Sequence, residues 1–243
     1  MGYNLRMRRI SFQNDGYYHI YNRGLEGRSL FLNTRDYERF ASGLYYFNDI
    51  NFIPDIYHCL DRPQVQGLTL EESDNRRELV DITAWCLVPT HYHLVLRQKI
   101  EDGVTKFMRR LGTGYTMYVN QKYERSGHIF HGSFQGRFIN KDRYLQHVIR
   151  YVHLNPLDLY DAAWRTGKTK DLEASKKFVL EYPWSSLGDY IGSERLPQLL
   201  SSVRREVVSH GPHEYAEFLW EWLTAGVPTD PLVSRIFQGQ TLD

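Results

Sequence analysis

Two apolar runs, DITAWCLV (81–88) and HYHLVLR (91–97), are separated only by Pro89 and Thr90. Each run is rich in the β-branched and aromatic residues that favour an extended chain. A two-residue connection between such runs is typical of a β-hairpin. The pattern therefore predicts that this part of the chain folds as two neighbouring antiparallel strands.

Hydrophobic periodicity and capping residues indicate further strands and helices along the chain. They are a strand over 16–24, a helix from Thr34 to about residue 49, a helix from Asp102 to about Tyr123, a short strand within 125–139, and a helix from Asp142 to Pro156. This order of strand, helix, hairpin, helix, strand and helix is typical of an α+β fold. We expect a ferredoxin-like split β-α-β core with a central antiparallel sheet and flanking helices.

The chain has 243 residues, which is enough for one well-filled core with appendages. Residues 50–80 are mixed and polar, so we expect a loop-rich insertion there. Near the C-terminal end, LLSSVRREVV (199–208) and EYAEFLWEWL (214–223) predict two helices. We therefore expect one domain over 1–190 and a C-terminal helical appendage over 191–243.

The composition excludes several classes of protein. With 24% charged and 14% aromatic residues, the chain is not expected to be disordered. It has no run of about 20 apolar residues for a membrane span, and its first residues lack the apolar stretch of a secretory signal. Cys59 and Cys86 are too few and too far apart for a disulfide framework or a zinc knuckle. We expect a reduced, soluble protein of the cytoplasm with no membrane partner.

The net charge of +1 hides a basic middle segment. Residues 103–153 contain nine basic residues against two acidic ones, and aromatic residues are interspersed among them. Cations bind phosphates and aromatic rings stack on unpaired bases, so this composition favours a nucleic-acid-binding surface. The alternative is a solvated helix face on which Lys and Arg outnumber the acids.

Two short patterns contain side chains suited to chemistry. His91 and His93 alternate on a predicted strand, so both imidazoles point to one face and could hold a divalent metal. Tyr151 and Asn155 are four residues apart on a predicted helix and share a face. By spacing alone, packing histidines, a core tyrosine and a helix-capping asparagine explain these residues equally well.

VPTHYHLVL (88–96) resembles the HUH motif of single-tyrosine transposases, and the chain is most similar to their REP-associated tyrosine transposase branch. Four other stretches carry the resemblance, in the family's order: YHIYNRG (18–24), which fits its HxxxRG strand; RSGHIFHGSFQGRF (125–138), which has two extra residues; HVIRYVHLNP (147–156), its tyrosine helix; and YPWSS (182–186). Together they cover about residues 16–190, which would make this region an HUH single-tyrosine transposase domain.

The resemblance implies that His91, His93 and Asn155 are metal ligands for Mg²⁺ or Mn²⁺ and that Tyr151 is the catalytic nucleophile. It further implies cleavage and rejoining of single-stranded DNA beside a palindromic, REP-like hairpin, through a 5′-phosphotyrosine intermediate. Such an enzyme would lie with the nucleoid in the cytoplasm. The basic segments also suggest DNA-binding residues, with plain surface charge as the alternative for each of them. They are Arg23, Arg109, Arg110, Arg125, Arg137 and Arg143.

The chain departs from the family pattern beside the histidines. Thr90 stands where relatives commonly have Asn, and the bulky Tyr92 separates the two histidines, on the opposite strand face. Tyr115 and Tyr118 are rival nucleophiles on an earlier helix, ranked below Tyr151 because they lie outside the matching motif. His19 lies in a family motif, but strand packing is its expected role.

Three alternatives remain open. The chain could be an autonomous insertion-sequence transposase, typically a dimer that exchanges its tyrosine helix between subunits. It could be a hairpin-binding protein without catalysis, although the intact set of histidines, tyrosine and asparagine argues against this. It could also be a metal-dependent hydrolase without a covalent intermediate, although no further acidic ligand cluster is evident. The long C-terminal appendage favours the REP-associated type and a monomer, with a dimer as the alternative.

Overall fold

The computed structural model describes residues 10–52, 76–140, 142–200, 211–229 and 233, with Asp142 and Arg143 described by their backbone only. Most of the loop-rich insertion expected over 50–80, and most of the helix expected over 199–208, lie outside the described residues. The boundary between 1–190 and 191–243 therefore stays a prediction.

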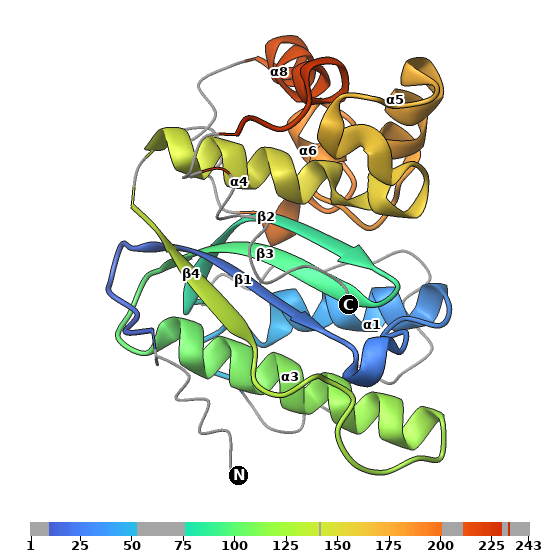
Figure 1. Ribbon diagram of the computed structural model, residues 1–243. Coiled ribbons are helices and arrows are strands. Elements are labelled where there is room, and N and C mark those ends of the chain that lie inside the picture. Colours follow the sequence, from blue (N-terminus) through green and yellow to red (C-terminus); the bar gives the residue numbers. More distant parts are fainter. Residues whose placement is uncertain (1–9, 53–75, 141, 201–210, 230–232, 234–243) are drawn as a thin grey trace, which may run out of the picture.

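A four-stranded antiparallel sheet forms the centre of the molecule (Figure 1). Its strands are β1 (Tyr17–Arg23), β2 (Val80–Val88), β3 (His91–Gln98) and β4 (Gln135–Ile139), in the order β2-β3-β1-β4. The predicted hairpin is confirmed, because β2 pairs with β3 across Pro89 and Thr90. The strand order and the helices between strands are those of a ferredoxin-like core, so the predicted α+β fold is also confirmed.

Helices cover both faces of this sheet (Figure 1). On one face lie α1 (Thr34–Tyr46) and α3 (Gly103–Lys122), and across the other face runs α4 (Asp142–Leu154). Side chains of β3 alternate between the two faces. Leu94 belongs to the hydrophobic core beneath α1 and α3, whereas Val95 belongs to the core that includes α4.

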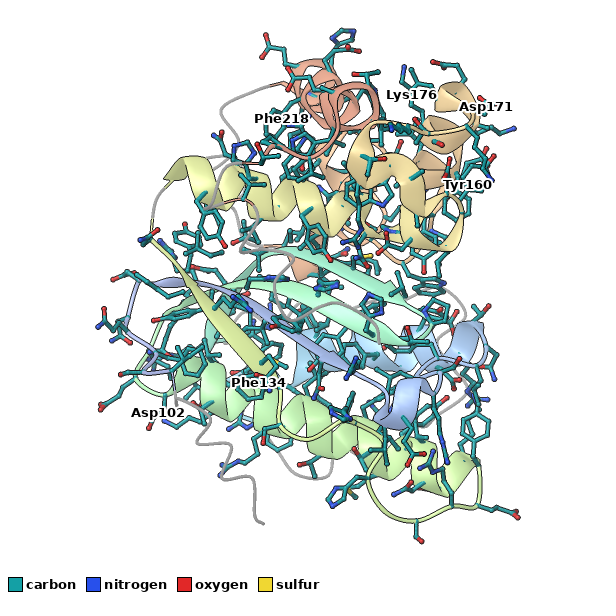
Figure 2. All side chains as sticks on the ribbon, viewed as in Figure 1. Asp102, Phe134, Tyr160, Asp171, Lys176 and Phe218 are labelled. Carbon is teal, nitrogen blue, oxygen red and sulfur yellow. The ribbon has the colours of Figure 1, made fainter. Side chains whose placement is uncertain are left out.

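A further layer of helices lies beyond α4, on the side away from the sheet (Figure 1). It comprises η2 (Asn155–Leu159), η3 (Ala162–Thr166), α5 (Leu172–Glu181), α6 (Leu187–Tyr190) and α8 (Pro212–Ala225). The short η4 (Pro197–Leu199) instead contacts α1, and its Leu199 belongs to the core beneath α1 and α3. In Figure 2, Phe218 and Lys176 lie in this layer, while Phe134 and Asp102 lie on the α3 side of the sheet. No helix among the described residues has the length and apolar character needed to cross a bilayer.

Buried polar contacts attach this layer to α4. The His153 ring contacts Tyr215 OH through Nδ1 at 2.5 Å and Ser186 Oγ through Nε2 at 2.8 Å. The Arg150 guanidinium lies over the Phe218 and Trp222 rings, 4.1 and 4.5 Å from their centres. Because Trp222 and Tyr215 both belong to α8, the last described helix is packed directly on α4.

Three helix boundaries differ from the predicted ones. Asn33, not Thr34, caps α1, because its side chain and that of Asp36 form a reciprocal capping box. The helix ends at Tyr46 rather than near residue 49. The α-helical turn of α4 ends at Leu154, and Asn155 begins a 3₁₀ turn, because Pro156 lacks the N–H that would extend the α-helix.

Candidate functional site

Two elements bring the residues suggested by the sequence together. His91 and His93 lie at the start of β3, on the sheet face that α4 crosses. Tyr151 lies in the last turn of α4, and Asn155 follows at the start of η2. Tyr151 is 1% exposed, His93 2% and Asn155 0%, whereas His91 is partly exposed. The four side chains therefore form one mostly buried cluster that reaches the surface beside His91.

The carboxamide of Asn155 connects the helix to the strand. Its Nδ2 donates to Tyr151 OH at 3.1 Å, and its Oδ1 lies 3.2 Å from His91 Nε2. Tyr151 and Asn155 therefore lie on the same face, as predicted for residues four apart on a helix, and they form a hydrogen bond. One amide spans the candidate nucleophile and a candidate metal ligand.

His91 and His93 each use the Nδ1 atom in a contact with another side chain of the protein. His91 Nδ1 lies 3.0 Å from Thr90 Oγ1, and His93 Nδ1 lies 3.0 Å from His19 Nε2. Burial lowers the pKa of His91 to about 4 and holds the pKa of His93 well below its usual range. Both rings are therefore neutral at pH 7. If each ring carries its proton on Nδ1, that proton is donated to Thr90 or to His19, and the lone pair of Nε2 can bind a metal.

The cluster fits a divalent ion held by two nitrogens and one oxygen. His93 Nε2 is buried without a hydrogen-bond partner, and the His91 Nε2 and Asn155 Oδ1 acceptors face each other. Imidazole nitrogen and amide oxygen are ordinary ligands of divalent metals. Among the described residues, no three or more His, Cys, Asp or Glu side chains are grouped to hold a metal. A metal would therefore depend on the Asn155 carboxamide as its third protein ligand.

His19 contributes more to this site than the expected strand packing. It is buried in β1, and burial lowers its pKa to about 3. In the register of β1 against β3, Tyr21 pairs with His93, and His19 lies diagonally beside that pair on the same face. This position brings its Nε2 to His93 Nδ1. Strand alternation predicts the shared face, but only the register reveals the contact.

An ion pair that the sequence does not single out lies beside Tyr151. Arg165 donates from Nε to Asp158 Oδ1 at 3.1 Å and makes a second bond to Oδ2. Its guanidinium carbon is 5.6 Å from the centre of the Tyr151 ring. Burial raises the pKa of Tyr151, and the charge and hydrogen bonding of Arg165 oppose that rise. The six residues between Asp158 and Arg165 include a turn, so no periodic pattern links the pair to Tyr151.

The rival tyrosines lie on the opposite side of the sheet. Tyr115 is buried, and its OH donates to the Leu30 carbonyl at 2.7 Å. The Tyr118 OH donates to the buried carboxylate of Asp36 at 2.9 Å. Tyr92 also faces this side, where its ring centre lies 5.0 Å from that of Phe40, as the strand alternation predicts. None of these phenols is near the paired histidines' ring nitrogens.

The six arginines suggested for DNA contact are dispersed. Arg23 pairs in register with His91, and Arg137 with His19, so both lie on the site face of the sheet. Arg109 and Arg110 lie on α3, on the other side. Arg110 donates to the Asp49 carbonyl at 2.6 Å.

Arg125 lies in the loop after α3 and donates to the His128 carbonyl at 3.2 Å. Arg143 lies in α4, with its side chain outside the described residues. Of the five predicted arginines whose side chains are described, only Arg23 and Arg137 therefore lie on the face of the candidate site.

One family model covers the segment that holds this cluster. It is described as "Transposase IS200 like" and matches residues 70–155, which include both histidines, Tyr151 and Asn155. No curated protein matches the chain. A solved structure described as "Structure of the REP associates tyrosine transposase bound to a REP hairpin" is similar over 76% of this chain and 85% of that chain. The two share 17% sequence identity, with a TM-score of 0.49. About a third of the chain, residues 70–155, is therefore similar to IS200-like transposases.

Proposed function

We propose that the chain is a metal-dependent endonuclease and strand transferase for single-stranded DNA. It would cleave beside palindromic, REP-like hairpins through a covalent 5′-phosphotyrosine on Tyr151. The observation that carries the proposal is the Asn155 carboxamide, which contacts the Tyr151 phenol with one atom and His91 Nε2 with the other. A phenol joined in this way to a histidine pair, within a transposase-family segment, favours tyrosine chemistry over hydrolysis by water.

His91, His93 and Asn155 would hold Mg²⁺ or Mn²⁺. When bound, such an ion withdraws negative charge from a phosphodiester and favours departure of the 3′ oxygen. Thr90 and His19 orient the two imidazoles through their Nδ1 atoms. Asn155 also orients the phenol, since its Nδ2 donates to the tyrosine oxygen.

In the reaction, the Tyr151 oxygen forms a bond to phosphorus while the bond from phosphorus to the 3′ oxygen breaks. The phenolic proton is lost, and the released 3′ oxygen gains one. Burial raises the pKa of Tyr151, so the phenol is protonated at pH 7 and must lose its proton as the new bond forms. One phosphate ester bond forms, to the tyrosine, for the one that breaks. A second 3′-OH can therefore reverse the step and join strands without ATP.

Charge and access on the same face support a DNA substrate. Arg23 and Arg137 lie on the strand face that carries the histidines, and His91 is the partly exposed member of the cluster. A single strand is narrower and more flexible than a duplex, so it suits a cluster that reaches the surface at one point. The proposed substrate would place the protein with the nucleoid in the cytoplasm.

The experiment is a search for a covalent protein–DNA adduct. An end-labelled single-stranded hairpin from DNA flanking the gene is incubated with the full chain and Mg²⁺ or Mn²⁺, then run on a denaturing gel. We expect an adduct with the wild-type chain and a loss of at least about 1,000-fold with Tyr151→Phe. Binding of the hairpin by the variant should change little.

Tyr115→Phe is the matched control, because it removes a buried phenol from the opposite side of the sheet. It should retain adduct formation. An adduct that survives Tyr151→Phe would contradict the assignment of the nucleophile. Tight hairpin binding without any adduct would favour a binding protein without catalysis, and cleavage without an adduct would favour a metal-dependent hydrolase.

A further inference from the structure

Arg165 reaches Tyr151 from outside the segment that the transposase family model matches. It belongs to η3, and its guanidinium carbon lies 5.6 Å from the centre of the Tyr151 ring. We propose, building on the proposed function, that Arg165 is a further catalytic residue. It would bind the phosphate that Tyr151 attacks and stabilise negative charge on the phenolic oxygen as the proton leaves.

The position of the Arg165 charge supports this role. The guanidinium carbon lies 5.6 Å from the centre of the Tyr151 ring and 5.3 Å from that of the Trp164 ring. A guanidinium stays protonated throughout the physiological pH range, so it supplies a fixed charge beside an oxygen that becomes more negative during attack.

The exposure of the two side chains differs in a way that suits phosphate capture. Tyr151 is 1% exposed, whereas the Arg165 side chain is 31% exposed. A phosphate arriving from solvent can therefore meet the guanidinium before it reaches the buried phenol. The planar fork of N–H groups on an arginine matches the oxygens of a phosphodiester.

Asp158 orients the guanidinium for this contact. Its carboxylate accepts from Arg165 through both oxygens, and Oδ1 also accepts from Trp164 Nε1 at 2.8 Å. A guanidinium has five N–H donors, and this pairing takes two of them. The ion pair thus fixes the plane of the arginine beside Tyr151.

The C-terminal helix holds the backbone from which Arg165 projects. Val227, just after α8, donates its N–H to the Arg165 carbonyl at 3.0 Å. Gly167 has a φ of +69°, and a Cβ there would lie 2.5 Å from the Gly226 nitrogen, so the two backbones are in direct contact. This inference gives the C-terminal appendage a function, which is to position a residue beside Tyr151.

The test measures adduct formation in a single turnover, with saturating hairpin and Mg²⁺. Arg165→Gln should lower the rate constant by about 100-fold, as expected when one charge-stabilising donor is removed from a reaction centre. Arg165→Lys keeps the charge and should recover part of the rate.

Arg97→Gln is the matched control. Arg97 forms a similar pair with the buried Asp81 through Nε and Nη2, at 2.7 and 2.6 Å, but at the far end of β3, about 20 Å from His91. Arg97→Gln should match Arg165→Gln in thermal stability and keep the wild-type rate.

Three results would overturn the inference. An unchanged rate in Arg165→Gln, with a normal wild-type adduct, would reject this role and leave the proposed function intact. An equal rate loss in Arg97→Gln would show that both variants act through lost stability, and it would also reject a catalytic role for Arg165. Absence of an adduct from the wild-type chain would reject both proposals.

Discussion

The two faces of the sheet use similar side chains in opposite ways. Beneath α1 and α3, the phenols of Tyr115 and Tyr118 donate to a backbone carbonyl and to a buried carboxylate, so the fold itself uses them. Beneath α4, Asn155 contacts both Tyr151 and His91, and His93 Nε2 has no hydrogen-bond partner. Residue type therefore does not distinguish Tyr151, the proposed nucleophile, from the phenols on the other face. What distinguishes the two faces is the set of contacts that each phenol makes.

The largest expected difference between the two faces is in their response to acid, which should destabilise the α4 side. The buried histidines of the described residues are His19, His93 and His153, and all lie on the α4 side. Burial lowers the pKa of His19 and of His153 to about 3. Between about pH 6.5 and pH 3 the unfolded chain therefore binds more protons than the folded chain, so stability falls as the pH falls through this window.

Each of these histidines should contribute a loss of about 1.4 kcal/mol per pH unit. By pH 4 the sum becomes comparable with the ~5–15 kcal/mol that stabilises a typical domain. Urea unfolding in EDTA at pH 7, 6 and 5 measures how the free energy of unfolding changes with pH. His153→Gln should reduce this slope by about 1.4 kcal/mol per pH unit, the effect of one proton. Equal unfolding free energies at pH 7 and 5 would contradict the prediction.

Removing a histidine of the pair should have the next largest effect. His91→Ala and His93→Ala each remove a nitrogen ligand, so Mn²⁺ affinity should fall by at least about 100-fold. Loss of a residue that only orients a metal ligand typically lowers affinity by about 10- to 100-fold, so loss of a ligand itself should cost at least as much. Titration calorimetry or the electron paramagnetic resonance of free Mn²⁺ measures the affinity.

Tyr92→Phe is the control for this comparison, because it alters the residue between the two histidines on the opposite face. Its Mn²⁺ affinity should equal that of the wild-type chain. If Tyr92→Phe weakened binding as much as His93→Ala, the assignment of the metal site to the α4 face would be wrong.

The smallest effect concerns His19, which contacts a proposed ligand without binding the metal itself. His19→Phe keeps a ring in the sheet but removes the contact with His93 Nδ1, so Mn²⁺ affinity should fall about 10-fold. His19→Gln supplies an acceptor again and should recover part of the affinity. Full affinity in His19→Phe would indicate that His19 only packs in the sheet.

Much of the fold could be predicted from the sequence because it is encoded in local patterns. The alternation of β3 and the two residues Pro89 and Thr90 predict the hairpin and the opposite orientation of Tyr92. The spacing of Tyr151 and Asn155 likewise predicts their contact. Strand register and helix packing bring His19 to His93 and Arg165 to Tyr151, and neither leaves a periodic signal in one sequence.

The paired backbones at Gly167 and Gly226 have a consequence for natural or engineered variants of this protein. A methyl group at Gly167 would need space that the Gly226 nitrogen occupies, and the positive φ there disfavours any other residue. Neither glycine carries a reactive group, and both lie outside the matched segment. A change at either position would look like a harmless loop substitution, yet it would displace the turn that carries Arg165. Variants with an intact set of histidines and tyrosine could thus lose activity through a steric change in the C-terminal region.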